Sequence, residues 1–124
     1  MDDASKKELR RRYKEKNLVP GVFQVKNHAN GKVLLGSSLN IAGPLNAHEF
    51  MLSINSHRNK ELQADYHSFG ANAFSFDILG IVKVTDDAEF NLEVELKTLE
   101  QLWLDELKPV GEGGYNPTDN IRQA

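Results

Sequence analysis

The sequence of 124 residues contains no cysteine, and this absence excludes several classes of protein. Without cysteine there is no disulfide framework, no thiol nucleophile and no thiolate metal site. Long apolar runs are also missing, since none approaches the roughly 20 residues that span a bilayer. Residues 1–16 are charged and lack the apolar centre of a secretory signal peptide. We therefore expect a cytoplasmic protein of bacterial type, with no membrane partner.

Charge is nearly balanced over most of the chain, but the net charge of −3 hides two biased segments. Residues 1–16 hold seven basic and four acidic side chains, whereas residues 86–106 hold eight acidic side chains and one basic. Proteins that bind nucleic acid usually present a basic surface, and only the N-terminal segment offers one here. With 40% apolar residues the chain can bury a core, and its length suits one domain.

The hydrophobic periodicity and the turn residues predict a fold of order ββααβα behind an N-terminal helix. The dipeptide Asn30-Gly31 is typical of a β-hairpin, Gly36 is expected to stop the second strand, and Pro44 is tolerated in a first helical turn. The expected elements are a helix at 3–16, strands at 22–26 and 32–35, helices at 43–54 and 59–69, a strand at 74–84 and a helix at 85–107. This is an α+β fold, a small three-stranded antiparallel sheet flanked by helices.

Four polar residues are candidates for chemistry: His48, His57, Glu100 and Asn116. His48 shares a face of its predicted helix with apolar neighbours, and Glu100 lies at the edge of the apolar stripe of the last helix. A histidine beside apolar neighbours is more often structural than a ligand, and a helical glutamate is usually just solvated. From the residues alone, both interpretations stay open for all four.

The order and spacing of several short segments add information that no single residue carries. Gly21-Val22-Phe23 is followed after ten residues by Leu34-Leu35-Gly36-Ser37. Further segments are Asn30-Gly31-Lys32, His48, His57-Arg58-Asn59-Lys60, Phe69-Gly70, Glu100-Gln101-Leu102-Trp103 and Gly114-Tyr115-Asn116. Together they resemble the GIY-YIG nuclease superfamily, in particular its stand-alone bacterial branch labelled LuxR-like. The resemblance divides the chain into a basic N-terminal helix (1–19), a GIY-YIG-like domain (20–117) and a C-terminal tail (118–124).

The resemblance implies hydrolysis of phosphodiester bonds in DNA, single-stranded DNA included, with Mg²⁺ or Mn²⁺ as cofactor. In this reading Glu100 binds the metal ion, which stabilises charge on the leaving oxygen. His48 and His57 match two histidine positions. Phe23 and Leu34 stand at the positions of the two signature tyrosines. Pro44 stands at the arginine position, and Ala47 one turn later.

These replacements remove a proton acceptor and a guanidinium from the expected catalytic set. An arginine that stabilises the transition state is worth roughly 10³ or more in rate, and a general base about 10²–10⁴. His48 is a candidate replacement for the base. Three cations, Lys26, Lys32 and Arg58, are candidates for positive charge, and with Asn116 they form the expected nucleic-acid-binding set.

Three functions therefore stay open. The first is a metal-dependent endonuclease with an altered active site. The second is a catalytically degenerate domain that binds nucleic acid or a protein partner without cutting. The third is an interaction protein that meets a basic partner through the acidic helix face around Asp86, Asp87, Glu89, Glu93 and Glu95. The first has the strongest support, because Glu100, His48, His57 and Asn116 are present together.

Overall fold

The computed structural model describes residues 18–117, so the helix expected at 3–16 and the tail at 118–124 lie outside the described residues. The elements follow the expected order ββααβα. They are β1 (Gly21–Asn27), β2 (Val33–Ser38), α2 (Ala42–Ser53), α3 (Lys60–Phe69), β3 (Phe74–Ile81) and α4 (Leu92–Leu107), with short 3₁₀ turns at Ala71–Ala73 and Gly111–Gly113. Within this part of the chain, no helix has the length and apolarity needed to cross a membrane.

The sheet is antiparallel, with β1 between β2 and β3. The three-stranded α+β fold predicted from the sequence is therefore confirmed. The register pairs Phe23 of β1 with Gly36 of β2, and an irregularity between Val22 and Phe23 shifts the pairing with β3. Because β2 lies at one side of the sheet, one of its edges faces away from β1.

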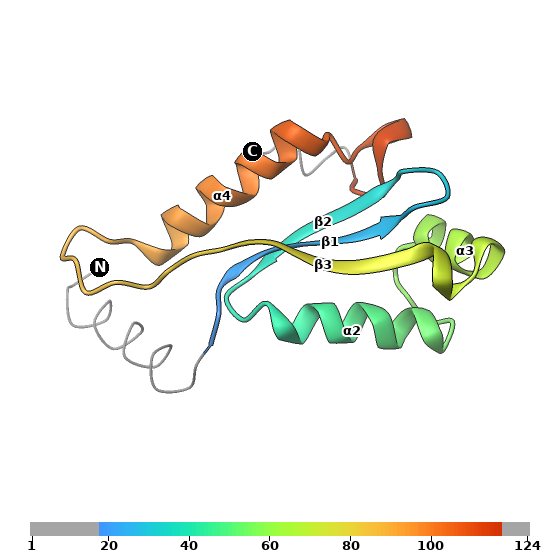
Figure 1. Cartoon of the computed structure of the whole chain (residues 1–124), viewed down its shortest axis with the longest axis horizontal. Helices are drawn as coiled ribbons and strands as arrows, with labels where there is room; N and C mark the ends of the chain where they lie inside the picture. The colour runs from blue at the N-terminus through green and yellow to red at the C-terminus, as the bar shows by residue number, and fades with distance from the viewer. Residues whose placement is uncertain (1–17, 118–124) are drawn as a thin grey trace.

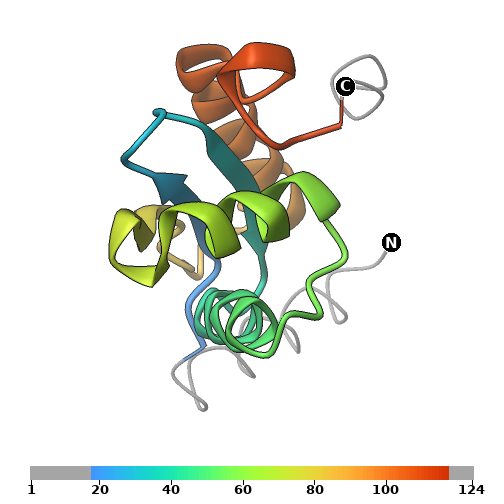
Figure 2. The same cartoon turned by 90° about the vertical axis from the view of Figure 1, so that its right-hand side faces the viewer.

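Two layers of helices cover the two faces of the sheet (Figure 1). Alternation along a strand sends successive side chains to opposite faces. Val25 and Leu34 pack with Leu52 of α2 and Leu62 of α3, whereas Val22 packs on the other face. The second cluster joins Val22 and Leu35 to Leu96 of α4. Figure 2 shows α2 and α3 on one side of the strands and α4 on the other.

The prediction that Gly36 stops the second strand is wrong, because β2 continues to Ser38. Gly36 lies inside the strand, where its missing Cβ makes room for the ring of Phe23. A Cβ added at Gly36 would lie 2.5 Å from Cζ of that ring. The glycine therefore marks a close approach between neighbouring strands rather than a chain break.

The last helix begins at Leu92 and not at residue 85, so this boundary was also predicted wrongly. Asn91 caps the helix by accepting a hydrogen bond from the Val94 N–H at 3.2 Å. Ahead of it, the Asp87 carboxylate accepts from the Glu89 N–H at 2.9 Å, which holds a turn instead of a helix. Acidic side chains compete in this way for local backbone donors. β3 likewise ends at Ile81, short of the expected residue 84.

A C-terminal loop covers part of the outer edge of β2. The Tyr115 N–H donates to the Val33 carbonyl at 2.9 Å. Asn116 follows, and its side chain accepts from the Leu35 N–H at 2.7 Å and donates to the Leu35 carbonyl at 2.9 Å. The Tyr115 hydroxyl, buried beneath, donates to Asp65 at 2.7 Å. The loop thus pairs with Val33 and Leu35, the N-terminal half of the edge.

Candidate active site

A hollow of about 320 Å³ opens beside β2 on the face covered by α2 and α3. Its wall combines residues of β2, α2 and the loop before α3: Leu34, Pro44, Ala47, His48, Met51, His57, Arg58 and Asn59. Six of these eight were singled out from the sequence. The structure thus brings both histidines together with Leu34, Pro44 and Ala47, the residues predicted to stand at the second tyrosine position and the arginine positions.

The two predicted histidines form a pair in this wall. His48 Nδ1 lies 2.7 Å from His57 Nε2, and the rings stack with centroids 4.9 Å apart. The backbone N–H of Asn59 donates to His57 Nδ1 at 3.0 Å. The His57 backbone N–H in turn donates to the Gln63 side chain at 2.9 Å, so this buried residue is held through both its ring and its backbone.

Burial keeps both imidazoles uncharged at neutral pH. It lowers the pKa of His57 to about 4, and the positive charges of His48 and Arg58 add to the effect. Burial also lowers the pKa of His48, with a further contribution from Arg58. Desolvation disfavours the charged form of an imidazole, and a neighbouring cation acts in the same direction. The pair therefore offers hydrogen-bonding groups rather than positive charge.

Of the three predicted cations, Arg58 lines the hollow, and its side chain is exposed. Lys32 is engaged elsewhere, since it forms an ion pair with Glu61 and lies over the ring of Tyr115. Lys26 lies two and four residues after Gln24 and Val22 in β1, so its side chain is on the same face of the sheet as theirs, the face covered by α4. Among these cations, the geometry favours Arg58 as the group that meets an anion in the hollow.

Glu100 lies on the other side of β2. Its carboxylate accepts a hydrogen bond from the Ser37 hydroxyl at 3.0 Å, and its side chain is half-buried. Ser37 shares the α4 face with Leu35, whereas Leu34 and Gly36 face α2. The carboxylate and the imidazole pair therefore flank the C-terminal end of β2 from opposite sides.

A short chain of contacts connects the two sides. Gly36, next to Ser37, carries the end of the Phe23 ring, and this ring lies 5.3 Å from that of His48 between centroids. Phe23 is buried, with 4% of its surface exposed, and it supplies no hydroxyl at the position where the resemblance predicts a signature tyrosine. Leu34, Pro44 and Ala47 likewise bring no ionisable group to the hollow.

Asn116 lies away from the wall of the hollow. The oxygen and the nitrogen of its amide form hydrogen bonds with the backbone of Leu35, so the side chain pairs with the edge of β2 as a neighbouring strand would. Its expected contact with nucleic acid stays a prediction. This pairing ends at Leu35, and the next backbone N–H and C=O groups that face outward on this edge belong to Ser37.

Two residues that matter in this geometry were missed from the sequence. No functional role was assigned to Ser37 from the sequence, although its two-residue spacing from Leu35 indicates the face that meets α4. Asn59 was read only as the start of a helix. It is the N-cap of α3, where its side chain accepts from the Leu62 N–H at 3.0 Å. The same residue orients His57 through its backbone N–H.

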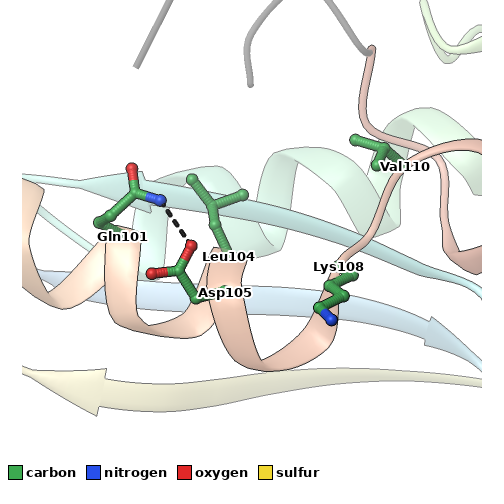
Figure 3. Close-up of a pocket in the computed structure, with 5 residues that line it drawn as sticks. All are labelled: Gln101, Leu104, Asp105, Lys108 and Val110. Carbon is green, nitrogen blue, oxygen red and sulfur yellow. Dashed lines mark hydrogen bonds between the residues drawn. The ribbon is translucent and has the colours of Figure 1, made fainter. Parts of the chain in front are cut away.

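A second hollow, of about 380 Å³, lies at the C-terminal end of α4 (Figure 3). Gln101, Leu104, Asp105, Lys108 and Val110 line it, and the Gln101 amide donates to the Asp105 carboxylate at 2.9 Å. None of the predicted site residues belongs to this wall, and its amide and carboxylate are bonded to each other. We therefore place the candidate site at β2.

The donor set for a metal ion is sparse. Residues 18–117 contain no group of three or more histidine, aspartate or glutamate side chains placed to hold an ion. Mg²⁺ is commonly held by one or two carboxylates together with substrate phosphates and water. Glu100 with its Ser37 partner fits that mode, in which the substrate supplies part of the coordination, and does not fit a cage made by the protein alone.

The architecture defines the structural class of this domain. A small sheet of order β2-β1-β3 has two helices on one face and a long helix on the other. This is the fold of GIY-YIG catalytic domains. No family model matches the sequence, and no curated protein matches it.

Two solved structures match the fold, and both are of the catalytic domain of the endonuclease I-TevI. One is described as an intron endonuclease mutant, with a TM-score of 0.60, 25% identity and coverage of 80% of this chain and 93% of its own. The other is described as a homing endonuclease, with a TM-score of 0.60, 26% identity and coverage of 78% and 96%. They support the GIY-YIG superfamily as the group to which this chain is related.

Proposed function

We propose that this chain is a GIY-YIG-type endonuclease domain with an altered active site, which hydrolyses phosphodiester bonds in DNA with Mg²⁺ or Mn²⁺. We place it in the stand-alone bacterial branch. The observation that carries the proposal is the position of Glu100, anchored by Ser37 at the end of β2, across the strand from the His48–His57 pair. The endonuclease domains that share the fold give the reaction class.

The strand end offers a place where a nucleic-acid backbone meets both groups. A β-strand is only one residue wide, so a chain that passes its edge at Ser37 has Glu100 on one side and the hollow on the other. A divalent ion on Glu100 would stabilise the negative charge of the leaving oxygen. Arg58 would bind phosphate oxygens in place of the family arginine, whose positions are occupied here by Pro44 and Ala47. A guanidinium suits this role because it presents five donors in a fixed plane.

A second function is favoured by the apolar character of the hollow. Leu34, Pro44 and Ala47 line it, and Phe23 packs on His48 beside it. These four residues lack both signature hydroxyls and the family arginine, so a domain that binds DNA without cutting fits the same geometry. Contacts made by Arg58 to phosphate would survive in such a domain. Binding would then weaken steeply as salt rises, since each neutralised phosphate releases counterions.

One experiment separates the two functions. Supercoiled plasmid and labelled single-stranded DNA are incubated with the full chain and Mg²⁺ or Mn²⁺, and both cleavage and binding are measured for wild type, Glu100→Ala and Glu106→Ala. Glu106 is an exposed carboxylate on the same helix and serves as the matched control.

Cleavage that is lost in Glu100→Ala and kept in Glu106→Ala supports the endonuclease. Binding without cleavage in either metal supports the degenerate domain and overturns the hydrolytic proposal. A chain that neither cuts nor binds DNA overturns both. A metal titration in the presence and absence of DNA adds a further check, because the single carboxylate predicts much tighter metal binding when phosphate is present.

A further inference from the structure

We infer that His48 is held as an uncharged hydrogen-bond donor that presents its Nε2–H to a phosphate oxygen beside Arg58, and that it does not take a proton from the attacking water. The inference deepens the proposed function, on which its phosphate ligand rests. It assigns to the imidazole pair a role in substrate binding, whereas the sequence suggested His48 as a replacement general base.

The proton positions follow from two consecutive hydrogen bonds. The Asn59 N–H donates to His57 Nδ1, so this nitrogen is an acceptor and carries no proton. An uncharged imidazole bears one proton, which must then lie on His57 Nε2. His57 Nε2 bonds His48 Nδ1, and the proton it carries makes His48 Nδ1 the acceptor. The single proton of uncharged His48 therefore lies on Nε2.

The opposite direction of the chain is not available. If His48 Nδ1 donated to His57 Nε2, both nitrogens of His57 would be acceptors and the ring would be an anion. Imidazole does not lose its last proton under ordinary conditions. The backbone of Asn59 thus determines the tautomer of a ring two hydrogen bonds away, in the way that a partner on one ring nitrogen determines the state of the other.

The Nε2–H of His48 is free to meet a ligand. His48 lines the hollow, and within residues 18–117 the hydrogen bond of its side chain uses Nδ1. No buried side-chain nitrogen or oxygen in this range lacks a partner, so the unpaired Nε2 is accessible to solvent. Arg58 is exposed on the same wall.

A donor N–H and a guanidinium on one wall suit an anion with several oxygens, as in a phosphodiester. A general base requires a free lone pair, and in this tautomer His48 has none on the exposed nitrogen. Burial and the Arg58 charge both oppose a second proton on either ring. The charged or ionisable neighbours of His57 are Arg58 and His48. Phe23 of β1, which packs on His48, adds no charge. The pair therefore stays neutral while it donates.

The first test reads the protons directly. Long-range ¹H–¹⁵N NMR correlations of the histidine rings in the full chain at neutral pH distinguish the two tautomers. We expect Nε2–H on both His48 and His57. An Nδ1–H tautomer on His48, or a charged ring, overturns the inference whatever the protein does with DNA.

The second test measures binding of a fluorescein-labelled single-stranded oligonucleotide, and of its duplex, by anisotropy. His48→Ala should weaken binding about tenfold, the value expected when one donor to a charged group is lost. His48→Gln, whose amide keeps an N–H, should recover most of the affinity. His67→Ala is the matched control, because His67 is an exposed histidine on α3. Thermal melting verifies that each variant folds.

Equal affinity of His48→Ala and wild type overturns the phosphate contact. Failure of His48→Gln to recover binding, with the fold intact, also counts against donation as the role of this ring. If the wild-type chain binds neither the single-stranded oligonucleotide nor the duplex, the proposed function and the phosphate contact are both overturned. The NMR tautomer still decides in that case whether His48 is a donor, so the two failures are distinguishable.

Discussion

Replacing Gly36 by alanine should destabilise the fold through one identified contact. The added Cβ would lie 2.5 Å from Cζ and 2.9 Å from Cε2 of Phe23, whereas carbon atoms in contact are normally about 3.5 Å or more apart. The ring is buried and also packs on His48, so it has little room to move. Overpacking of this kind costs roughly 1–3 kcal/mol.

Urea unfolding of four proteins measures this cost: wild type, Gly36→Ala, Phe23→Leu and the double variant. If the ring is the obstacle, the double variant should lose less stability than the sum of the single losses, by about 1 kcal/mol or more. Gly43→Ala is the matched control. Nothing lies within 4 Å of a Cβ at Gly43 in α2, so alanine should be neutral or stabilising there.

The reasoning fails if Gly36→Ala is as stable as wild type. It also fails if the loss is unchanged when leucine replaces Phe23, because the strain would then come from another neighbour. The DNA-binding assay adds a functional reading, since a displaced Phe23 ring would also disturb His48.

Three further predictions concern the hollow. His57 is neutral in the folded chain down to a pKa of about 4, but takes up a proton below about pH 6.5 when unfolded. The free energy of unfolding should therefore fall as pH drops from 6.5 to 4, and His57→Gln should flatten this part of a denaturation series; an unchanged slope contradicts the shift. Ala47→Arg restores a guanidinium at an exposed position of the wall and should tighten DNA binding and raise any cleavage, as gel assays would show; no gain argues against the assigned wall. Arg58→Ala should reduce the slope of log affinity against log salt concentration by about 1, because one phosphate contact is lost. The exposed control Lys83→Ala should leave this slope unchanged.

Local patterns in the sequence were enough for most of the secondary structure. Asn30-Gly31 predicts the hairpin, and Gly31 has the positive φ of 81° that such a turn requires. Asn59 stands at the start of α3, where its side chain forms the cap. These signals depend on neighbours a few residues away. The boundaries at Gly36 and at residue 85 were predicted wrongly because each depends on a contact or competing hydrogen bond that propensity does not include.

The arrangement of the candidate site was decided by contacts between residues far apart in the chain. The sequence by itself indicated that His48, His57, Glu100 and three cations were worth attention, and its resemblance to GIY-YIG nucleases predicted which signature residues are replaced. Only the tertiary structure placed Glu100 and the imidazoles on opposite sides of β2, because the partner of Glu100 is 63 residues away. It also brought Arg58 rather than Lys26 or Lys32 to the wall and set the direction of hydrogen bonding in the histidine pair. A one-residue shift along a strand reverses the face of a side chain, so such choices follow from strand register and packing rather than from residue type.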